Sequence, residues 1–210
     1  MIDGNPLGLD NVVRWLLHQP GFHTGRINYG QNELYFKFNS AIRDFHWEGS
    51  ELSKKELKVI YYFTHYYYSD DITTRDIECC YMVRKGTNKP FIHPENSICV
   101  DNLSHEQIAT IFRCSKRFIC YDDYTAYSIF AILCGCESIV VPAEGVPIEQ
   151  WYPDEKDRYG IAYGLNDAQL DWARETRHNV IERIESEHKK SEENVKEFIK
   201  ELERYFFNLS

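Results

Sequence analysis

The chain has 210 residues, of which 43% are hydrophobic and 27% are charged, a composition typical of a soluble globular protein of one large or two small domains. Its 24 basic and 33 acidic residues give a formal net charge of −9, which argues against a general nucleic-acid binder, because such proteins present a basic face. No apolar run approaches the roughly 18 residues of a membrane-spanning helix, and no signal peptide is recognisable, so we expect a cytoplasmic protein.

The seven cysteines are an odd number and form no Cys-x-x-Cys pair. Six of them lie in or beside apolar runs: Cys79, Cys80, Cys99, Cys120, Cys134 and Cys136. This distribution predicts buried, reduced thiols. The eight histidines are scattered without a metal-binding spacing, so no metal site is expected.

The first segment is predicted to contain one helix and two strands. Asp10 or Asn11 can cap a helix over residues 12–17, which ends before a Gln-Pro-Gly turn. Alternation of polar and apolar residues predicts a strand over residues 33–38, and an apolar run predicts another over 57–63. These elements are too few for a complete domain.

A second domain is predicted to begin at a polar linker over residues 70–75. A buried strand is expected over residues 78–83 and a short strand over residues 97–100. Ser104 and Gln107 have the spacing of a capping box, which predicts that a helix begins there.

A strand–helix–strand unit follows, with strands over residues 118–121 and 138–141 and a helix that ends near Gly135. Such a crossover predicts parallel strands in an α/β sheet. Ligands of these sheets bind at the carboxyl ends of strands, where helix N-termini present N–H groups to anions. The polar corner at 122–125 and the turn at 143–145 lie at these ends, so we expect both to border an active site.

The remainder of the chain is predicted to be a short strand or turn at 159–164 and a long helical tract from Asp167 to Phe207. The charged residues of this tract are expected to form a solvated face. We therefore expect an α/β protein with a Rossmann-like parallel sheet over residues 78–165, flanked by helices. The C-terminal helix is expected to cross back to the first segment.

The order of these elements resembles the donor-binding half of GT-B glycosyltransferases, in a bacterial polysaccharide-type subset. That half commonly combines an acidic residue with a later Glu-Ala-Met-x-x-Gly. Asp122 stands at the first acidic position, and residues 130–135 match the later motif except that Phe130 replaces the glutamate. Residues 84–86, Arg-Lys-Gly, are similar to the basic pair that such enzymes direct at the donor diphosphate. Residues 5–21 look like the segment that closes the acceptor half.

The resemblance implies three parts: a remnant of an acceptor-side domain over 1–69, a donor nucleotide-sugar domain over 70–188, and a C-terminal helix over 189–210. It implies a cytoplasmic glycosyltransferase of the hexosyltransferase type in polysaccharide biosynthesis. The donor would be a nucleotide-diphosphate sugar and the acceptor a saccharide or glycolipid, without cofactor or metal; peripheral association with a membrane is compatible with this role. Because the first part is short, we expect a fragment or a natural truncation that is slow or inactive in transfer.

The expected donor site gathers residues from three strand ends: Arg84, Lys85, Asp122, Tyr124, Thr125, Ala126, Ser128, Gly145 and Glu149. A diphosphate would be neutralised by the cations and would accept hydrogen bonds from the hydroxyls of Thr125 and Ser128 and from free N–H groups at Ala126 and Tyr127. Gly145 is included because a Cβ there is expected to crowd the ligand. No catalytic residue can be assigned.

A second interpretation stays open. Asp122 and Asp123 can serve as a helix cap, and Arg84 with Lys85 can be a solvated strand end. The missing acid at Phe130 and the short first segment favour a non-catalytic Rossmann-like binding or scaffold module, in the form of a truncated glycosyltransferase. Binding of a nucleotide diphosphate, with or without hydrolysis of a donor, would separate the two interpretations.

Overall fold

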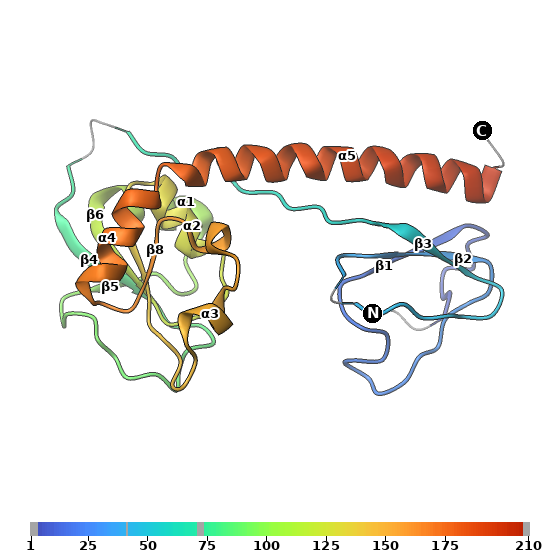
Figure 1. Cartoon of the computed structure of the whole chain (residues 1–210), viewed down its shortest axis with the longest axis horizontal. Coiled ribbons are helices and arrows are strands. Elements are labelled where there is room, and N and C mark those ends of the chain that lie inside the picture. Colours follow the sequence, from blue (N-terminus) through green and yellow to red (C-terminus); the bar gives the residue numbers. More distant parts are fainter. Residues whose placement is uncertain (1–3, 41, 71–73, 208–210) are drawn as a thin grey trace. The chain divides into compact units, whose positions relative to one another are not determined.

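The computed structural model describes residues 4–40, 42–70 and 74–207. Tertiary contacts divide the chain into two compact units (Figure 1). Unit 1 comprises Met1–Tyr61 and Ser186–Ser210, and unit 2 comprises Tyr62–Glu185. The boundaries therefore lie at Tyr62 and Ser186, whereas the sequence suggested residues 70 and 189. Residues 71–73 of the expected linker are outside the described residues.

Unit 1 contains a three-stranded parallel sheet in the order β1-β2-β3. The strands are β1 (Val12–Leu16), β2 (Glu33–Lys37) and β3 (Glu51–Glu56). The helix expected over 12–17 is wrong, because this segment pairs residue by residue with β2. The strand expected over 57–63 is also wrong, because β3 ends before this segment begins. The strand expected over 33–38 is confirmed as β2.

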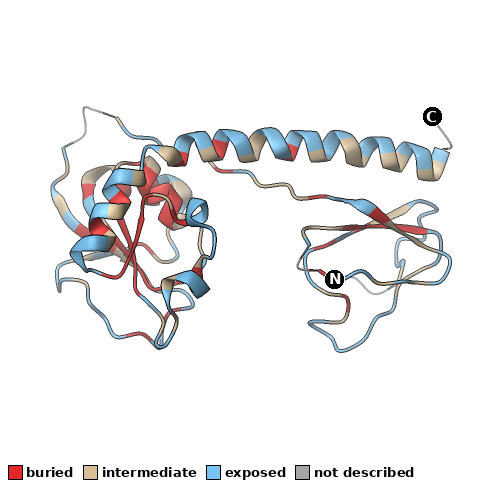
Figure 2. Ribbon diagram, in the orientation of Figure 1, coloured by how far each residue is buried: buried red, intermediate tan, exposed pale blue. Residues whose placement is uncertain are grey.

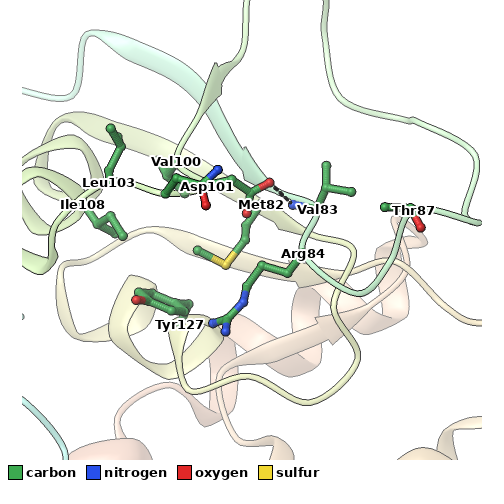
Figure 3. A pocket seen from close by; sticks show the side chains of 10 residues that line it. Met82, Val83, Arg84, Thr87, Val100, Asp101, Leu103, Ile108 and Tyr127 are labelled. Atoms are coloured by element: carbon green, nitrogen blue, oxygen red, sulfur yellow. Dashed lines mark hydrogen bonds between the residues drawn. The ribbon is translucent and has the colours of Figure 1, made fainter.

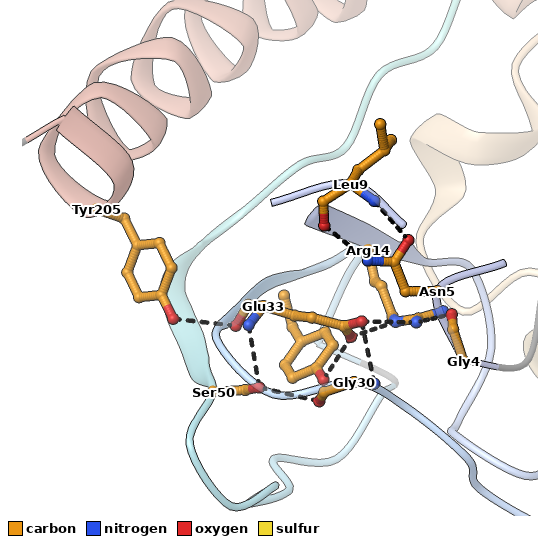
Figure 4. Close-up of polar contacts among 9 residues, drawn as sticks. Gly4, Asn5, Leu9, Arg14, Gly30, Glu33, Ser50 and Tyr205 are labelled. Atoms are coloured by element: carbon orange, nitrogen blue, oxygen red, sulfur yellow. Dashed lines mark hydrogen bonds and ion pairs between the residues drawn. The ribbon is translucent and has the colours of Figure 1, made fainter. Parts of the chain in front are cut away.

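The segment over residues 12–17 was expected to be a helix because the buried charge of Arg14 hides its strand pattern. β1 alternates as a strand, with Arg14 and Leu16 buried and Trp15 exposed between them. Arg14 interrupts the apolar pattern in the sequence, yet its Nε and Nη2 atoms lie 2.5 and 2.8 Å from the Glu33 carboxylate (Figure 4). Because a buried charge is tolerated only when it is paired, the interior position of Arg14 depends on a partner from β2.

Glu33 is buried among hydrogen-bond donors (Figure 4). In addition to Arg14, its carboxylate accepts from the Tyr35 hydroxyl at 2.8 Å and from the Gly30 N–H at 3.0 Å. Burial acts to raise the pKa of Glu33, but the hydrogen bonds from Arg14 and Tyr35 outweigh it and hold the pKa below its ordinary value. This network is satisfied within unit 1 and has a structural role.

The C-terminal part of α5 (Asn179–Phe207) packs on the sheet of unit 1. The Phe198 ring lies edge-on against Phe36 with centroids 5.0 Å apart, and the Tyr205 hydroxyl donates to the Glu33 carbonyl at 3.4 Å. The expected return of the C-terminal helix to the first segment is thereby confirmed. The tract expected from 167 to 207 is divided into α4 (Asp167–Thr176) and α5.

Unit 2 is an α/β unit with a five-stranded, wholly parallel sheet in the order β5-β4-β6-β7-β8. Its strands are β4 (Ile77–Met82), β5 (Ile98–Cys99), β6 (Ser115–Cys120), β7 (Glu137–Val140) and β8 (Ile161–Tyr163). The sheet is flanked by α1 (His105–Cys114), α2 (Tyr127–Leu133) and α4, and α3 (Ile148–Trp151) and a 3₁₀ turn (Glu155–Arg158) lie between β7 and β8. The Rossmann-like parallel sheet expected from the sequence is confirmed.

The carboxyl-terminal halves of the inner strands β6 and β7, residues 118–120 and 138–140, are buried (Figure 2). Such strands are apolar on both faces because helices cover both sides of a parallel sheet. The expected capping box is also confirmed: Ser104 Oγ accepts from Gln107 N at 3.3 Å, and Gln107 Oε1 accepts from Ser104 N at 3.0 Å.

The direction in which the chain adds strands to the sheet of unit 2 reverses beside β4. The chain passes from β4 outward to β5 on one side, then returns across it to β6 on the other side. Connections that leave neighbouring strands in opposite directions open a crevice at their carboxyl ends, where ligands of such sheets bind. The candidate site therefore belongs at the ends of β4, β5 and β6.

Candidate functional site

A cavity of about 640 Å³ lies at the carboxyl ends of β4 and β5, against the beginning of α2 (Figure 3). It is lined by Met82, Val83, Arg84, Thr87, Val100, Asp101, Asn102, Leu103, Ile108 and Tyr127. One wall is apolar, and the remainder offers a cation, a carboxylate, hydroxyls and an amide. A cavity with convergent polar groups is a candidate ligand site.

The loop after β4 turns sharply and presses against β6. Arg84 has a φ of 41°, a conformation that non-glycine residues rarely adopt. Gly86 is buried, and a Cβ there would collide with the carbonyl group of Tyr121. The Arg-Lys-Gly run thus contains glycine because the backbone of the loop touches that of β6. The strained φ of Arg84, at a strand end beside a cavity, is of a kind that clusters at functional sites.

Among the residues that the sequence placed in the donor site, Arg84 is the one that lines the cavity. Its guanidinium carbon lies 5.6 Å from the centre of the Tyr127 ring, and its Nε lies 3.9 Å from Asp122 Oδ2. The side chain is 46% exposed, so it is accessible to a ligand. Lys85 is also exposed but does not line the cavity.

The corner after β6 is organised by its own side chains. Asp122 is buried, and its Oδ1 accepts from the Tyr124 N–H at 3.3 Å. Thr125 Oγ1 accepts from the Tyr127 N–H at 3.3 Å, so the N–H expected to be free at Tyr127 is already bonded. Ala126 is exposed and stands at the N-cap of α2 without a side-chain cap bond. The corner therefore works mainly as a turn before a short helix.

Ser128 faces the protein interior rather than the cavity. It is 2% exposed, and its hydroxyl lies against the Cys120 thiol. Burial raises the pKa of Cys120 to about 12, an effect that the neighbouring Ser128 hydroxyl partly opposes. The expectation that this hydroxyl points at a ligand diphosphate does not agree with that burial.

The remaining expected site residues lie on the side of β7. Tyr124 is exposed, and its hydroxyl donates to the Trp151 carbonyl at 3.3 Å. Glu149 is exposed in the first turn of α3. Gly145 has a φ of 73°, and a Cβ there would meet no atom within 4 Å, so crowding is not the reason for this glycine. None of these three residues lines the described cavity.

Lys89 is an organising residue that the sequence did not reveal. Its side chain is 5% exposed, and its Nζ lies 2.6 Å from Asp123 Oδ1 and 2.6 Å from the Val141 carbonyl. It thereby joins the loop after β4 to the ends of β6 and β7. In the sequence Lys89 is one of two lysines in a polar loop, and no local pattern distinguishes it from the solvated Lys85.

The same loop is fastened to Tyr121. The Tyr121 hydroxyl accepts from the N–H groups of Ile92 and His93 at 2.7 and 3.2 Å, and it contacts His93 Nδ1 at 2.8 Å. The His93 ring also stacks on Tyr81 with centroids 3.6 Å apart. Burial lowers the pKa of His93, which favours the neutral imidazole in the folded protein.

Asp101 lies on the cavity wall two residues after the end of β5, and no sequence pattern distinguished it as a site residue. Its Oδ2 accepts from the Val83 N–H at 2.9 Å. Its Oδ1 is buried and has no hydrogen-bond partner among the described residues. The next residue, Asn102, has a φ of 64° and also lines the cavity. The ends of β4 and β5 thus each carry a non-glycine residue with positive φ.

Phe130, which replaces an acid of the GT-B pattern, is a core residue. It is 3% exposed and stacks on Tyr67 with centroids 4.2 Å apart and planes 4° from parallel. The ring therefore packs inside unit 2, and its position offers no polar contact to the cavity.

The described part of the chain has neither a metal-binding cluster nor a membrane-spanning helix. No cluster of three or more His, Cys, Asp or Glu side chains there could hold a metal ion. No helix of the described residues is long and apolar enough to cross a bilayer. All seven cysteines are free thiols; burial is as expected for most of them, whereas Cys99 is exposed.

Comparison of the chain with known protein families, with curated proteins and with solved structures gave no match.

Proposed function

We propose that unit 2 binds a nucleotide-diphosphate sugar in the cavity at the ends of β4 and β5, and that the protein is a glycosyltransferase acting on a saccharide or glycolipid acceptor. The observation that carries this proposal is the position of Arg84, an accessible cation at a cavity beside the change of strand direction. The sequence resemblance supplies the reaction class.

The cavity supports the proposal by its size and its chemistry. About 640 Å³ lies within the range of small-molecule sites. Arg84 offers donors that match phosphate oxygens, and the partly exposed side chain of Leu103 offers an apolar contact for a base. Asp122 stands 3.9 Å from Arg84, too far for a tight hydrogen-bonded pair, so the guanidinium keeps donors for a ligand.

The chemistry of sugar transfer suits such a site. The departing nucleoside diphosphate gains negative charge as its bond to the sugar breaks. A cation held beside the diphosphate stabilises that charge in the transition state. In this proposal Arg84 binds and orients the diphosphate, and the residues that bind the acceptor are not assigned.

A non-catalytic nucleotide-binding module is the second candidate. It is favoured by Phe130, because the position of an acid in the GT-B pattern is occupied by a buried aromatic ring. This candidate shares the ligand but predicts no turnover.

Calorimetry with UDP-, GDP- and dTDP-sugars and the matching free nucleoside diphosphates tests the proposal. We expect at least one nucleotide-sugar to bind, and we expect Arg84→Met to weaken that binding by about 10-fold or more, as for loss of a hydrogen bond to a charged group. Lys85→Met is the matched control, since it removes a neighbouring exposed cation outside the cavity.

Failure of every nucleotide-sugar to bind would overturn the proposed function. If a nucleotide-sugar binds, turnover is measured as release of the free nucleotide, with and without added saccharide acceptors. Binding without any release of nucleotide would favour the non-catalytic module.

A further inference from the structure

We propose that Tyr121 is a positioning residue for ligand binding: it holds the turn over residues 83–86 in the strained conformation that places Arg84 at the cavity. This inference rests on the proposed function, because it concerns how the cation that binds the diphosphate is held. It assigns a role to a residue that directly follows β6 and does not itself line the cavity.

Arg84 occupies a turn position that favours glycine. The Gly86 N–H donates to the Val83 carbonyl at 2.8 Å, which closes a four-residue turn with Arg84 and Lys85 at its centre. Arg84 has a φ of 41°, whereas the φ of Lys85 is not positive. A turn with positive φ only at its first central residue usually has glycine there, because a Cβ is disfavoured. Arginine at this position therefore costs stability, and the surrounding structure must hold it in place.

The backbone of Tyr121 supports this turn. A Cβ on Gly86 would collide with the carbonyl group and the Cβ of Tyr121, so the two residues are in direct contact. The Tyr121 N–H also donates to the Met82 carbonyl at 2.9 Å, which fixes the register between the two strand ends. Because Gly86 is only two residues from Arg84, its contact with Tyr121 limits the conformations that the turn can adopt.

The hydroxyl of Tyr121 is fixed by three polar contacts with residues 92–93. It accepts from the Ile92 and His93 N–H groups at 2.7 and 3.2 Å, and it lies 2.8 Å from His93 Nδ1. A tyrosine hydroxyl has one proton and two acceptor lone pairs. The two N–H groups fill the lone pairs, so the proton is left for Nδ1 of a neutral His93. The Tyr121 side chain is fully buried, so water does not compete for these bonds.

Tyr121 therefore contacts the loop after β4 at two places, with its backbone at Gly86 and with its hydroxyl at residues 92–93. Phenylalanine in its place keeps the aromatic packing and releases the second attachment. The ring, and the turn that rests on this residue, can then shift. Hydrogen bonds from the Arg84 guanidinium to phosphate oxygens depend on distance and angle, so a small shift of the turn weakens them.

Calorimetry on the full chain with UDP, GDP, uridine and guanosine tests this role. We expect Tyr121→Phe to weaken binding of the better diphosphate by about 5-fold or more, and to change the affinity for the matching nucleoside by less than about 2-fold. A residue that only supports the fold would weaken both ligands alike. In an Arg84→Met background the added Tyr121→Phe change should alter diphosphate affinity by less than about 2-fold, because its effect acts through Arg84.

Tyr163→Phe is the matched control, because it removes a hydroxyl that donates to the Val146 carbonyl at 2.9 Å, at the end of β8 and outside the cavity. It should leave the affinity for both diphosphates unchanged. Urea unfolding checks that each variant is folded. If Tyr121→Phe does not fold, His93→Phe takes its place under the same criteria, since it removes only the Nδ1 acceptor.

Three results would overturn the inference while the proposed function stands: unchanged diphosphate affinity in Tyr121→Phe, an equal loss for diphosphate and nucleoside, or an undiminished effect in the Arg84→Met background. Failure of the wild-type protein to bind any nucleotide would instead overturn the proposed function, and the positioning role of Tyr121 with it.

Discussion

Replacement of Lys89 by methionine should destabilise unit 2. The side chain of Lys89 is 5% exposed, and its ammonium group donates to Asp123 Oδ1 and to the Val141 carbonyl, both at 2.6 Å. Methionine keeps the apolar stem and removes the charge. Asp123 and Val141 then lose a donor that comes from a different part of the chain.

The magnitude follows from the exposure of the two partners. Breaking a fully buried ion pair by removal of one partner costs about 3–5 kcal/mol, whereas an exposed pair contributes about 0–1 kcal/mol. Asp123 is 27% exposed, so water can solvate part of its carboxylate when Lys89 is absent. We therefore expect a loss of about 2–3 kcal/mol in the free energy of unfolding.

Urea unfolding followed by circular dichroism measures this loss, and hydrogen exchange measures the opening of the loop after β4. Lys85→Met, an exposed lysine in the same loop, is the control and should change stability by less than about 0.5 kcal/mol. Combining Lys89→Met with Asp123→Asn should cost less than the sum of the single changes, because the unpaired carboxylate is then gone. The reasoning is refuted if Lys89→Met is as stable as Lys85→Met and the loop exchanges at the wild-type rate.

Two further predictions concern the same loop. Gly86→Ala should lower the free energy of unfolding by about 2–3 kcal/mol, because its Cβ would collide with the Tyr121 backbone. Gly145→Ala places its Cβ in open space and should lower it by only about 1 kcal/mol, the cost of the positive φ. Equal losses in urea unfolding would contradict this reasoning. Because burial lowers the pKa of His93, the unfolded chain takes up a proton more readily, so stability should be full above about pH 6.5 and fall as the pH decreases toward 5. His93→Gln should make that decrease shallower, and an unchanged slope would show that His93 is not its source.

Features that depend on neighbours in the sequence were predictable. The capping box at Ser104 and Gln107 is a contact between residues three positions apart, and the structure contains it. The parallel sheet of unit 2 followed from short apolar runs alternating with a helix, since a crossover of this kind has one favoured handedness and strand direction. The corners after β6 and β7 were placed at the correct edge of the sheet for the same reason.

Features that depend on distant partners were decided by the tertiary structure. Arg14 can occupy a strand interior because Glu33 on β2 neutralises it, and without that partner the segment looked helical. The bonds of Lys89 to Asp123 and Val141 join residues far apart in the chain. The bond from the Val83 N–H to Asp101 likewise joins residues that are far apart in the chain, at the ends of neighbouring strands.

The sequence by itself determined the class of the fold and the edge of the sheet at which a site would lie. Apolar periodicity and turn chemistry act over a few residues, and strand order then requires the carboxyl ends to meet at one edge. Which side chains line the cavity was decided only by the folded chain. Burial and pairing of a charge depend on what other strands bring within hydrogen-bond distance, and a linear pattern does not contain that information.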